Sequence, residues 1–363
     1  MEMSLKQLGW HSYFDALWQG REEVHWLPAR VISQQRGLWR VAGDFEECWA
    51  EASGALRAAA EVGGDWPATG DWVATETLSG GGRPLIQQVL PRRSKFVRKV
   101  AGRRMEEQVI AANVDTAFVV MALDGDFNVR RLERYLAQCS ESGAKSIVVL
   151  NKSDDCADVA ARVAEVESIA AGVPIFAVSA RTGDALNRLD TFLSAGQTIV
   201  LLGSSGVGKS TLLNHFLRRD AQAVQPVRPG DSRGRHTTTS RELFALPGGA
   251  LLIDTPGLRE LQLWDAVEGV EQAFADIAEL AAACKYGNCG HTNEAGCALQ
   301  AALSEGRLDQ GRLENWRKLL REQEFQRRKA DPEARQKDKE RVKLLHRGAK
   351  KIYEQRRKDG GKE

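Results

Sequence analysis

One stretch of sequence decides the fold of this chain: Gly203-Ser204-Ser205-Gly206-Val207-Gly208-Lys209-Ser210-Thr211. Its glycines and its Lys-Ser pair stand at the fixed positions of the P-loop pattern. The apolar run 198–202 before it is typical of a buried strand, and residues 211–217 after it have the pattern of a helix. The alternative is a glycine-rich turn that only precedes a helix. We predict an α/β domain in which Lys209 contacts the β- and γ-phosphates and Ser210 binds Mg²⁺.

A second motif, Asn151-Lys152-Ser153-Asp154, indicates which base is bound. The carboxylate of Asp154 can accept hydrogen bonds from guanine N1–H and from the exocyclic amine, a donor pair that adenine lacks. We expect Asn151 to face N7 and brace the P-loop, while the Lys152 stem lies along the ring. After the strand-like run 174–178 comes Ser179-Ala180, where a backbone N–H is expected to meet guanine O6. These loops predict a guanine nucleotide site.

A third motif, Asp254-Thr255-Pro256-Gly257, follows the apolar run 250–253. Asp254 fits the carboxylate that holds Mg²⁺ through water, and Gly257 fits the backbone N–H that senses the γ-phosphate. A loop rich in Gly, Arg and Thr lies between the P-loop and this motif. We expect one of its threonines, Thr238 or Thr239, to complete the Mg²⁺ shell, and the sequence does not choose between them.

Leu258 follows this motif, at the position where many GTPases carry a glutamine that orients the attacking water. A leucine side chain cannot orient water. His236 adjoins the threonines of the switch loop, and an imidazole with a pKa near neutrality can accept a hydrogen bond from water. We predict that His236 is the catalytic residue; the alternative is that it packs or contacts RNA.

The order of these motifs along the chain is permuted. Ordinary GTPases run from the P-loop to the guanine motifs, whereas here the guanine motifs at 151–154 and 179–180 come first. A parallel sheet permits this order if the old termini are joined. A short link between a predicted helix, 184–194, and the strand 198–202 supplies that join. The central domain is therefore predicted to be a circularly permuted GTPase, of a P-loop α/β fold.

The N-terminal third of the chain has a different pattern of hydrophobic residues. Residues 4–18 space Trp10, Phe14 and Trp18 at helical intervals, which predicts an amphipathic helix with a packing role. Short alternating runs then follow, which favour a small β-barrel of the OB-fold type: 26–32, 38–42, 45–50, 71–75 and 85–89. Its tryptophans could stack on bases or fill the barrel, and filling is the preferred reading. The basic segment 92–104 is a candidate phosphate contact.

Four metal-ligand residues lie close together near the C-terminus: Cys284, Cys289, His291 and Cys297. Three thiolates and one imidazole suit tetrahedral zinc, and four protein ligands imply a structural site. Clustering of half of the six cysteines argues for a reducing compartment and against a disulfide framework. We predict one structural Zn²⁺ in a mostly α-helical domain.

The last segment is basic. Residues 307–363 contain 20 Lys and Arg against 11 Asp and Glu, although the whole chain has a net charge of only +2. Such a run can be a solvated tail, but beside a zinc module and a barrel it favours RNA contact. No apolar run is long enough to cross a membrane and no signal-peptide core is present, so we expect a cytoplasmic protein, a monomer, without membrane contact. The predicted parts are a helical extension (1–21), an OB-fold (22–95), the permuted GTPase domain (96–265), a zinc-binding domain (266–330) and a basic helical tail (331–363).

These features together resemble the ribosome small-subunit-dependent GTPase A (RsgA) family. The resemblance rests on the motif order, the Cys-Cys-His-Cys spacing and three segments: Gly70-Asp71-Trp72-Val73, Ala112-Asn113-Val114-Asp115 and Gly234-Arg235-His236-Thr237-Thr238-Thr239. It implies a protein that binds the 30S subunit and its 16S rRNA late in maturation. It also implies that GTP is hydrolysed to GDP and phosphate, that the subunit stimulates this reaction, and that the factor then leaves.

Two other functions are compatible with parts of the sequence. One is an RNA-docking module in which the nucleotide state only switches conformation, and turnover with and without 30S particles separates it from a GTPase. The other is a permuted GTPase of large-subunit assembly, which shares the motif order but does not account for the barrel and the zinc spacing.

Overall fold

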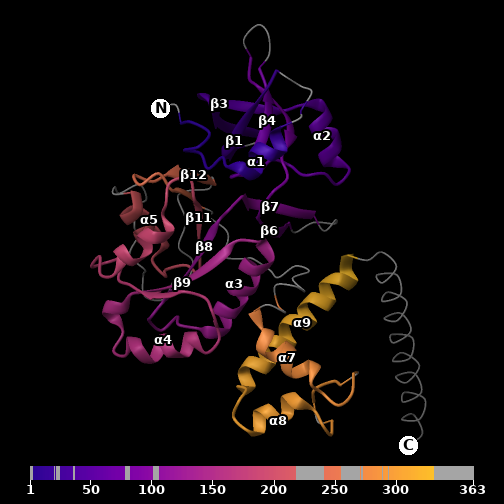
Figure 1. Cartoon of the computed structure of the whole chain (residues 1–363), viewed down its shortest axis with the longest axis vertical. Coiled ribbons are helices and arrows are strands. Elements are labelled where there is room, and N and C mark those ends of the chain that lie inside the picture. The colour runs from indigo at the N-terminus through magenta and orange to yellow at the C-terminus, as the bar shows by residue number, and fades with distance from the viewer. Residues whose placement is uncertain are drawn as a thin grey trace, which may run out of the picture.

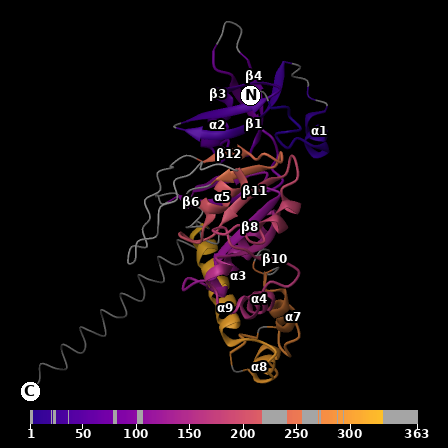
Figure 2. The same ribbon diagram turned by 90° about the vertical axis from the view of Figure 1, so that its left-hand side faces the viewer.

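The computed structural model describes residues 3–19, 21, 25–35, 37–77, 82–100, 106–217, 241–254, 270, 273–287, 289–292 and 294–330. Figure 1 shows three parts arranged along the long axis: a β-barrel, a central α/β part and a helical C-terminal part. The turned view in Figure 2 keeps this order, with the central sheet between the other two parts. The parts follow the predicted sequence of domains, and the exact boundaries between them stay a prediction.

The N-terminal barrel consists of β1 (Trp26–Gln35), β2 (Leu38–Gly43), β3 (Phe45–Ala52), β4 (Trp72–Glu76) and β5 (Leu85–Val89). The strands lie in the order β1-β2-β3-β5-β4, and β4 pairs back to β1 and closes the barrel. The β3–β5 pair is parallel, and the helix α2 (Gly54–Glu61) connects β3 to β4. This connectivity is that of the OB-fold, so the predicted fold is confirmed.

Within residues 3–19 of the segment before the barrel, the helix is limited to α1 (Ser12–Trp18), which corrects the predicted helix over 4–18. The chain turns at Gly9, whose φ of +89° favours glycine and where a Cβ would overlap the Gly196 carbonyl. The predicted packing role is right, because the ring of Trp10 lies 4.7 Å from that of Trp72, edge to face. Phe14 is also buried beside Trp72.

The barrel tryptophans divide between the two predicted roles. Trp39 is buried in the barrel core, as predicted, whereas Trp72 is buried outside that core, in the cluster that also contains Phe14. Trp66 is 43% exposed and stacks on Trp39 with ring planes 10° apart. Trp66 thus presents part of its ring to solvent, while Trp39 and Trp72 each stabilise a hydrophobic core.

The central sheet continues from the barrel. Its strands are β8 (Thr116–Ala122), β9 (Lys145–Asn151), β10 (Ile175–Ala177), β11 (Thr198–Leu202), β12 (Glu242–Ala245) and β13 (Leu251–Asp254), in the order β10-β9-β8-β11-β13-β12. All neighbouring pairs are parallel except β12–β13. Alternate residues of β8 enter two hydrophobic cores, as expected for a strand buried on both faces. The helices α3 (Val129–Ser142) and α4 (Val159–Glu167) cover one face, and α5 (Lys209–Leu217) and the 3₁₀ helix η2 (Leu186–Phe192) cover the other.

The join that permutes the domain is short. The predicted helix over 184–194 is the 3₁₀ helix η2, and residues 193–197 lead from it into β11. Gly196 adopts a φ of +77° and donates its N–H to the Gly249 carbonyl at 2.9 Å. The old termini therefore lie together at the edge where β13 begins, which is why a few residues connect them.

Two features of the junction between barrel and sheet were not predicted. The basic segment after the barrel forms a two-stranded sheet of β6 (Lys95–Val100) and β7 (Glu106–Ala112). In addition, β12 pairs with β1 at Ser33 and Glu242, so barrel and central strands form one continuous sheet. Short charged strands have weak periodicity, and a single bridge leaves no pattern in the sequence.

Arg30 holds this junction together. Its guanidinium is buried and donates to the carbonyls of Leu8, of Gly70 at 3.2 Å and of Asn113 at 3.2 Å. Burial lowers the pKa of Arg30 to about 10, which leaves it charged at neutral pH. A Cβ on Gly70 would overlap the Ala112 carbonyl. The segments 70–73 and 112–115 therefore meet here, where close backbone approach requires glycine.

The C-terminal part contains α7 (Ala275–Ala282), α8 (Ala298–Ser304) and α9 (Gln310–Ala330). It packs on α3 through a buried acid, Glu133, whose carboxylate accepts from Arg312 at 2.6 Å and from Asn315. Arg134 donates to Glu322 at 2.7 and 2.9 Å beside it. Charged residues of α3 thus attach the C-terminal helices to the central domain, and Figure 1 shows α9 beside α3.

We expect Glu133→Ala to loosen α9 strongly, because it leaves the buried Arg312 with Asp276 as its remaining carboxylate partner. The opening free energy of α9 amides should fall by about 3 kcal/mol in hydrogen exchange. The control is Glu165→Ala, which breaks an exposed pair with Arg162 on α4 and should change that energy by less than about 1 kcal/mol. Equal protection of α9 in both variants would contradict this anchoring role.

Two general expectations concern the whole chain. All six cysteines are described and none of them forms a disulfide. Within the described ranges, no helix has both the length and the apolar character that a bilayer crossing requires.

Candidate nucleotide site and metal centre

The predicted nucleotide motifs meet at one edge of the central sheet. Asn151 ends β9, the P-loop follows β11, Asp254 ends β13, and Ser179 comes soon after β10. These strands are parallel neighbours or are separated only by β8. Their carboxyl ends therefore lie side by side, the usual position of ligand sites in doubly wound sheets. The permuted chain brings its motifs together as an unpermuted one does.

Two P-loop glycines are required by close contacts. Gly203 has a φ of +143°, and a Cβ there would overlap the Val120 carbonyl on the adjacent strand β8. Gly208 has a φ of +97°, and a Cβ there would overlap the Asn151 amide. Only glycine combines these backbone angles with this space. The P-loop is thus in close contact with both β8 and the predicted guanine loop.

Lys209 begins α5, so the positive end of this helix lies behind the loop. Its ammonium donates to the carbonyls of Gly203 at 2.8 Å and of Ser204 at 2.6 Å. Ser210 and Thr211 follow in the first turn of the same helix. The remaining predicted P-loop residues, Ser205, Gly206 and Val207, complete the turn between β11 and α5. A glycine-rich turn that leads into a helix beginning with a lysine is the arrangement that suits phosphate binding.

Asn151 connects the P-loop to the guanine loops. It is 2% exposed, and its amide donates to the Val207 carbonyl at 2.8 Å. Its Oδ1 accepts from the Ala180 N–H at 2.9 Å. One buried side chain therefore sets the spacing between the phosphate end and the base end of the site.

Asp154 lies in the short 3₁₀ helix Ser153–Asp155, directly after Lys152 in a left-handed conformation with φ 65°. A hydrogen bond from the Ser179 side chain, together with the charge of Arg181, lowers the pKa of Asp154 below its usual value. The carboxylate is thus ionised at neutral pH and can only accept hydrogen bonds. Such a group suits the two adjacent N–H donors of guanine.

Two charged neighbours of this loop were missed. Arg181 directly follows Ser179-Ala180 and forms ion pairs with Asp154 and, at 3.0 Å, with Asp155. The Lys152 ammonium binds Asp124 at 2.7 Å. The position of Arg181 directly after Ser179-Ala180 is a sequence signal for its ion pair with Asp154. The ion pair between Lys152 and Asp124 depends instead on the alignment of β8 with β9.

The predicted magnesium side is described only in part. β11 and β13 pair through Val200 and Ile253, which brings the start of α5, with Ser210, near the end of β13, with Asp254. The other predicted residues of this side, Gly257, Thr238, Thr239 and His236, lie outside the described residues. Their roles stay predictions.

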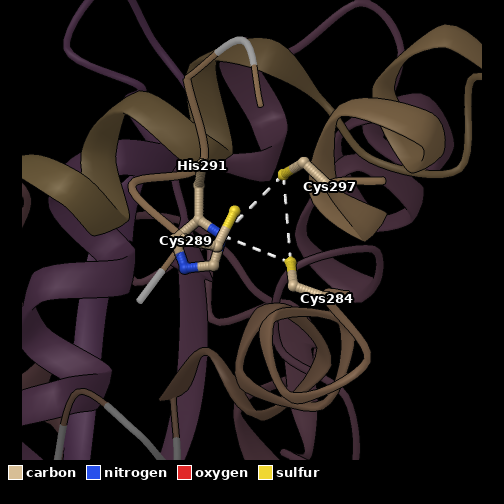
Figure 3. A group of neighbouring side chains, drawn as sticks. All are labelled: Cys284, Cys289, His291 and Cys297. Carbon is tan, nitrogen blue, oxygen red and sulfur yellow. Dashed lines mark hydrogen bonds between the residues drawn. The ribbon is translucent and has the colours of Figure 1, made fainter. Parts of the chain in front are cut away.

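The four predicted metal ligands converge in the C-terminal part (Figure 3). The ligand atoms of Cys284, Cys289, His291 and Cys297 all lie within 4.8 Å of one another. Cys284 Sγ is 3.4 Å from His291 Nδ1 and 3.9 Å from Cys297 Sγ. Tetrahedral zinc with Zn–S bonds of about 2.3 Å separates its sulfurs by about 3.8 Å. The spacing and the ligand set therefore fit zinc.

The surrounding backbone orients these ligands. The N–H of Ala298, at the start of α8, donates to Cys284 Sγ at 3.4 Å, as is common for metal-bound thiolates. His291 has a φ of 58°, and its carbonyl accepts from Gln300 at 2.8 Å and from Arg317 of α9. The cluster thus ties the loop 284–297 to two helices, and the predicted structural role of the site stays a prediction.

We expect Cys289→Ala to lose the bound zinc and to unfold the C-terminal part, because removal of one ligand breaks a closed shell. Zinc content by mass spectrometry should fall from one equivalent, and helices α7 and α8 should become sensitive to protease. Guanine nucleotide affinity should stay close to that of the unchanged chain. Cys48→Ala, a barrel cysteine outside the cluster, is the control. Full zinc retention by Cys289→Ala would refute the assignment.

Comparison with known proteins agrees with this geometry. The model of the RsgA GTPase family matches residues 89–264. A small ribosomal subunit biogenesis GTPase RsgA of Opitutus terrae is 44% identical over 355 residues, 95% of this chain and 97% of the relative. The chain belongs to the RsgA GTPase family. The RsgA protein of Streptomyces coelicolor is 47% identical over 85% of this chain and 84% of its own.

Solved structures of similar fold support the architecture. YjeQ from Thermotoga maritima superposes with a TM-score of 0.60 at 24% identity, covering 81% of this chain and 97% of YjeQ. YloQ, described as a circularly permuted GTPase, gives a TM-score of 0.57 at 23% identity, covering 84% and 97%. The predicted permutation is confirmed, and membership in the RsgA family makes this chain a GTP hydrolase.

Proposed function

We propose that this RsgA-family chain is a cytoplasmic, monomeric GTPase that binds the 30S ribosomal subunit through 16S rRNA and acts as a late maturation checkpoint. The observation that supports a guanine nucleotide is the meeting of four loops at one sheet edge, with Asn151 bonded to both the P-loop and Ala180. The proposed partner is supported by relatives named small ribosomal subunit biogenesis GTPase. Such a factor hydrolyses GTP to GDP and phosphate and then leaves the subunit.

The proposed site divides the ligand among the loops. Gly203 to Thr211 surround the phosphates, and Ser210 binds Mg²⁺ with Thr238 or Thr239, while Asp254 acts through water. Gly257 senses the γ-phosphate, and the guanine loops bind the base. His236 accepts a hydrogen bond from the attacking water, because Leu258 cannot. In this proposal, contact with the 30S subunit positions His236 for catalysis, and stimulation of hydrolysis by the subunit follows from that contact.

The proposed RNA-binding surfaces lie at both ends of the molecule. The exposed face of Trp66 in the barrel suits stacking on an unpaired base. At the other end, α9 carries the exposed Lys318 and Arg321, which suit phosphate contacts. In this proposal the zinc holds the C-terminal surface in shape without taking part in hydrolysis.

Multiple-turnover phosphate release with and without purified 30S subunits tests the proposal. We expect hydrolysis to be slow alone and to be stimulated by 30S but not by 50S subunits. Tight binding to 30S without stimulated turnover would favour the alternative, an RNA-docking module whose nucleotide state only switches conformation. Equal stimulation by 50S subunits would contradict the small-subunit assignment.

A further inference from the structure

A cation from α3 contacts the P-loop. The guanidinium of Arg131 donates through Nη1 to Ser204 Oγ at 2.6 Å and to Asp126 Oδ2 at 2.6 Å. The backbone N–H of Arg131 donates to the side chain of Asn128, which caps the helix, at 3.0 Å. Both ends of the Arg131 residue are therefore fixed, and its side chain reaches a loop that is distant in sequence.

Ser204 is thereby held from two sides. Its hydroxyl accepts from Arg131, and its backbone carbonyl accepts from the Lys209 ammonium at 2.6 Å. Ser204 follows Gly203, whose position is fixed by close approach to β8. Because the loop binds phosphates through backbone N–H groups, the orientation of these peptides determines how well the loop fits its ligand.

We propose that Arg131 is a positioning residue for phosphate binding: it fixes Ser204 so that the P-loop has its binding geometry before nucleotide arrives. This inference rests on the proposed nucleotide site. The carboxylate of Asp126 offsets the charge of Arg131. Arg131 therefore contributes to phosphate binding mainly by positioning Ser204, and only weakly by long-range attraction of the phosphates. Preorganisation of this kind raises affinity by reducing the cost of ordering the loop on binding.

The helix that carries Arg131 is itself anchored. On α3, Arg130 pairs with Asp309, Glu133 accepts from Arg312, and Arg134 donates to Glu322. Along the sequence of α3, Arg131 therefore lies between residues that contact the C-terminal part.

The test compares guanine nucleotide affinity in single and double variants. Arg131→Ala should weaken both GDP and GTP binding by about tenfold, the usual effect of losing a hydrogen bond to a charged group. Ser204→Ala should weaken binding similarly, and the double variant should be no weaker than either single one. Arg131→Lys, which keeps a donor, should recover much of the affinity. Nucleotide-free Tm should be unchanged in all four.

Arg134→Ala is the matched control, because it removes an arginine of the same helix that contacts α9 and not the P-loop. It should leave GDP affinity unchanged. Additive losses for Arg131→Ala and Ser204→Ala, or unchanged affinity in Arg131→Ala, would overturn the inference while the proposed nucleotide site stands. If Arg131→Ala fails to fold, the GDP and GTP affinities of Ser204→Ala and Arg131→Lys are compared with those of the unchanged chain instead, and unchanged affinity in Ser204→Ala overturns the inference. Failure of the unchanged chain to bind GDP would instead overturn the proposed site, and this inference with it.

Discussion

Asp154→Asn is expected to reduce GTP affinity roughly 10³-fold, because the variant loses one hydrogen-bond acceptor and the negative charge of the other, and each charge-assisted hydrogen bond contributes about 2 kcal/mol. An asparagine amide offers one acceptor and one donor, a pattern that suits the carbonyl and N–H of xanthine. The variant should therefore prefer xanthosine triphosphate. Competition of both triphosphates against a fluorescent nucleotide measures the change.

The control for this variant is Asp155→Asn. Asp155 is the next residue, is exposed and pairs with the same Arg181, so it shares the local charge without the position expected to read the base. Its GTP affinity should match that of the unchanged chain. Unchanged GTP affinity in Asp154→Asn would remove Asp154 from base recognition, and an equal loss in both variants would indicate a general charge effect.

His236→Ala is expected to lower 30S-stimulated hydrolysis on the order of 10²-fold, which is typical for loss of a group that positions or deprotonates the attacking water. GTP affinity and 30S binding should persist, because the proposed role concerns only the transition state. Single-turnover phosphate release with saturating 30S subunits separates the chemical step from binding.

His215→Ala provides the control for that measurement. His215 is an exposed histidine in the last turn of α5, and its ring lies 6.0 Å from that of Phe216. Its removal should leave stimulated hydrolysis near that of the unchanged chain. If His236→Ala binds GTP and 30S and still hydrolyses at the full stimulated rate, another group orients the water.

The barrel and the junction differ in how far the sequence predicted them. The five barrel runs predicted an OB-fold because alternation in a half-buried strand is a local property, and β1 to β5 agree with it. The length of the N-terminal helix was overestimated. Gly9 must approach Gly196, a residue of the permutation join, and no local pattern contains that contact.

By itself, the sequence determined the motif chemistry: the P-loop, Asp154 after Asn151, and the zinc ligands, because these residue types have fixed spacing along the chain. The contacts between segments that are distant in the sequence were decided only by the tertiary structure. The contact of Arg131 with Ser204, the burial of Glu133 under α9 and the three carbonyls bound by Arg30 each join distant segments. Such contacts depend on strand order and helix packing, which bring together side chains that no local periodicity relates.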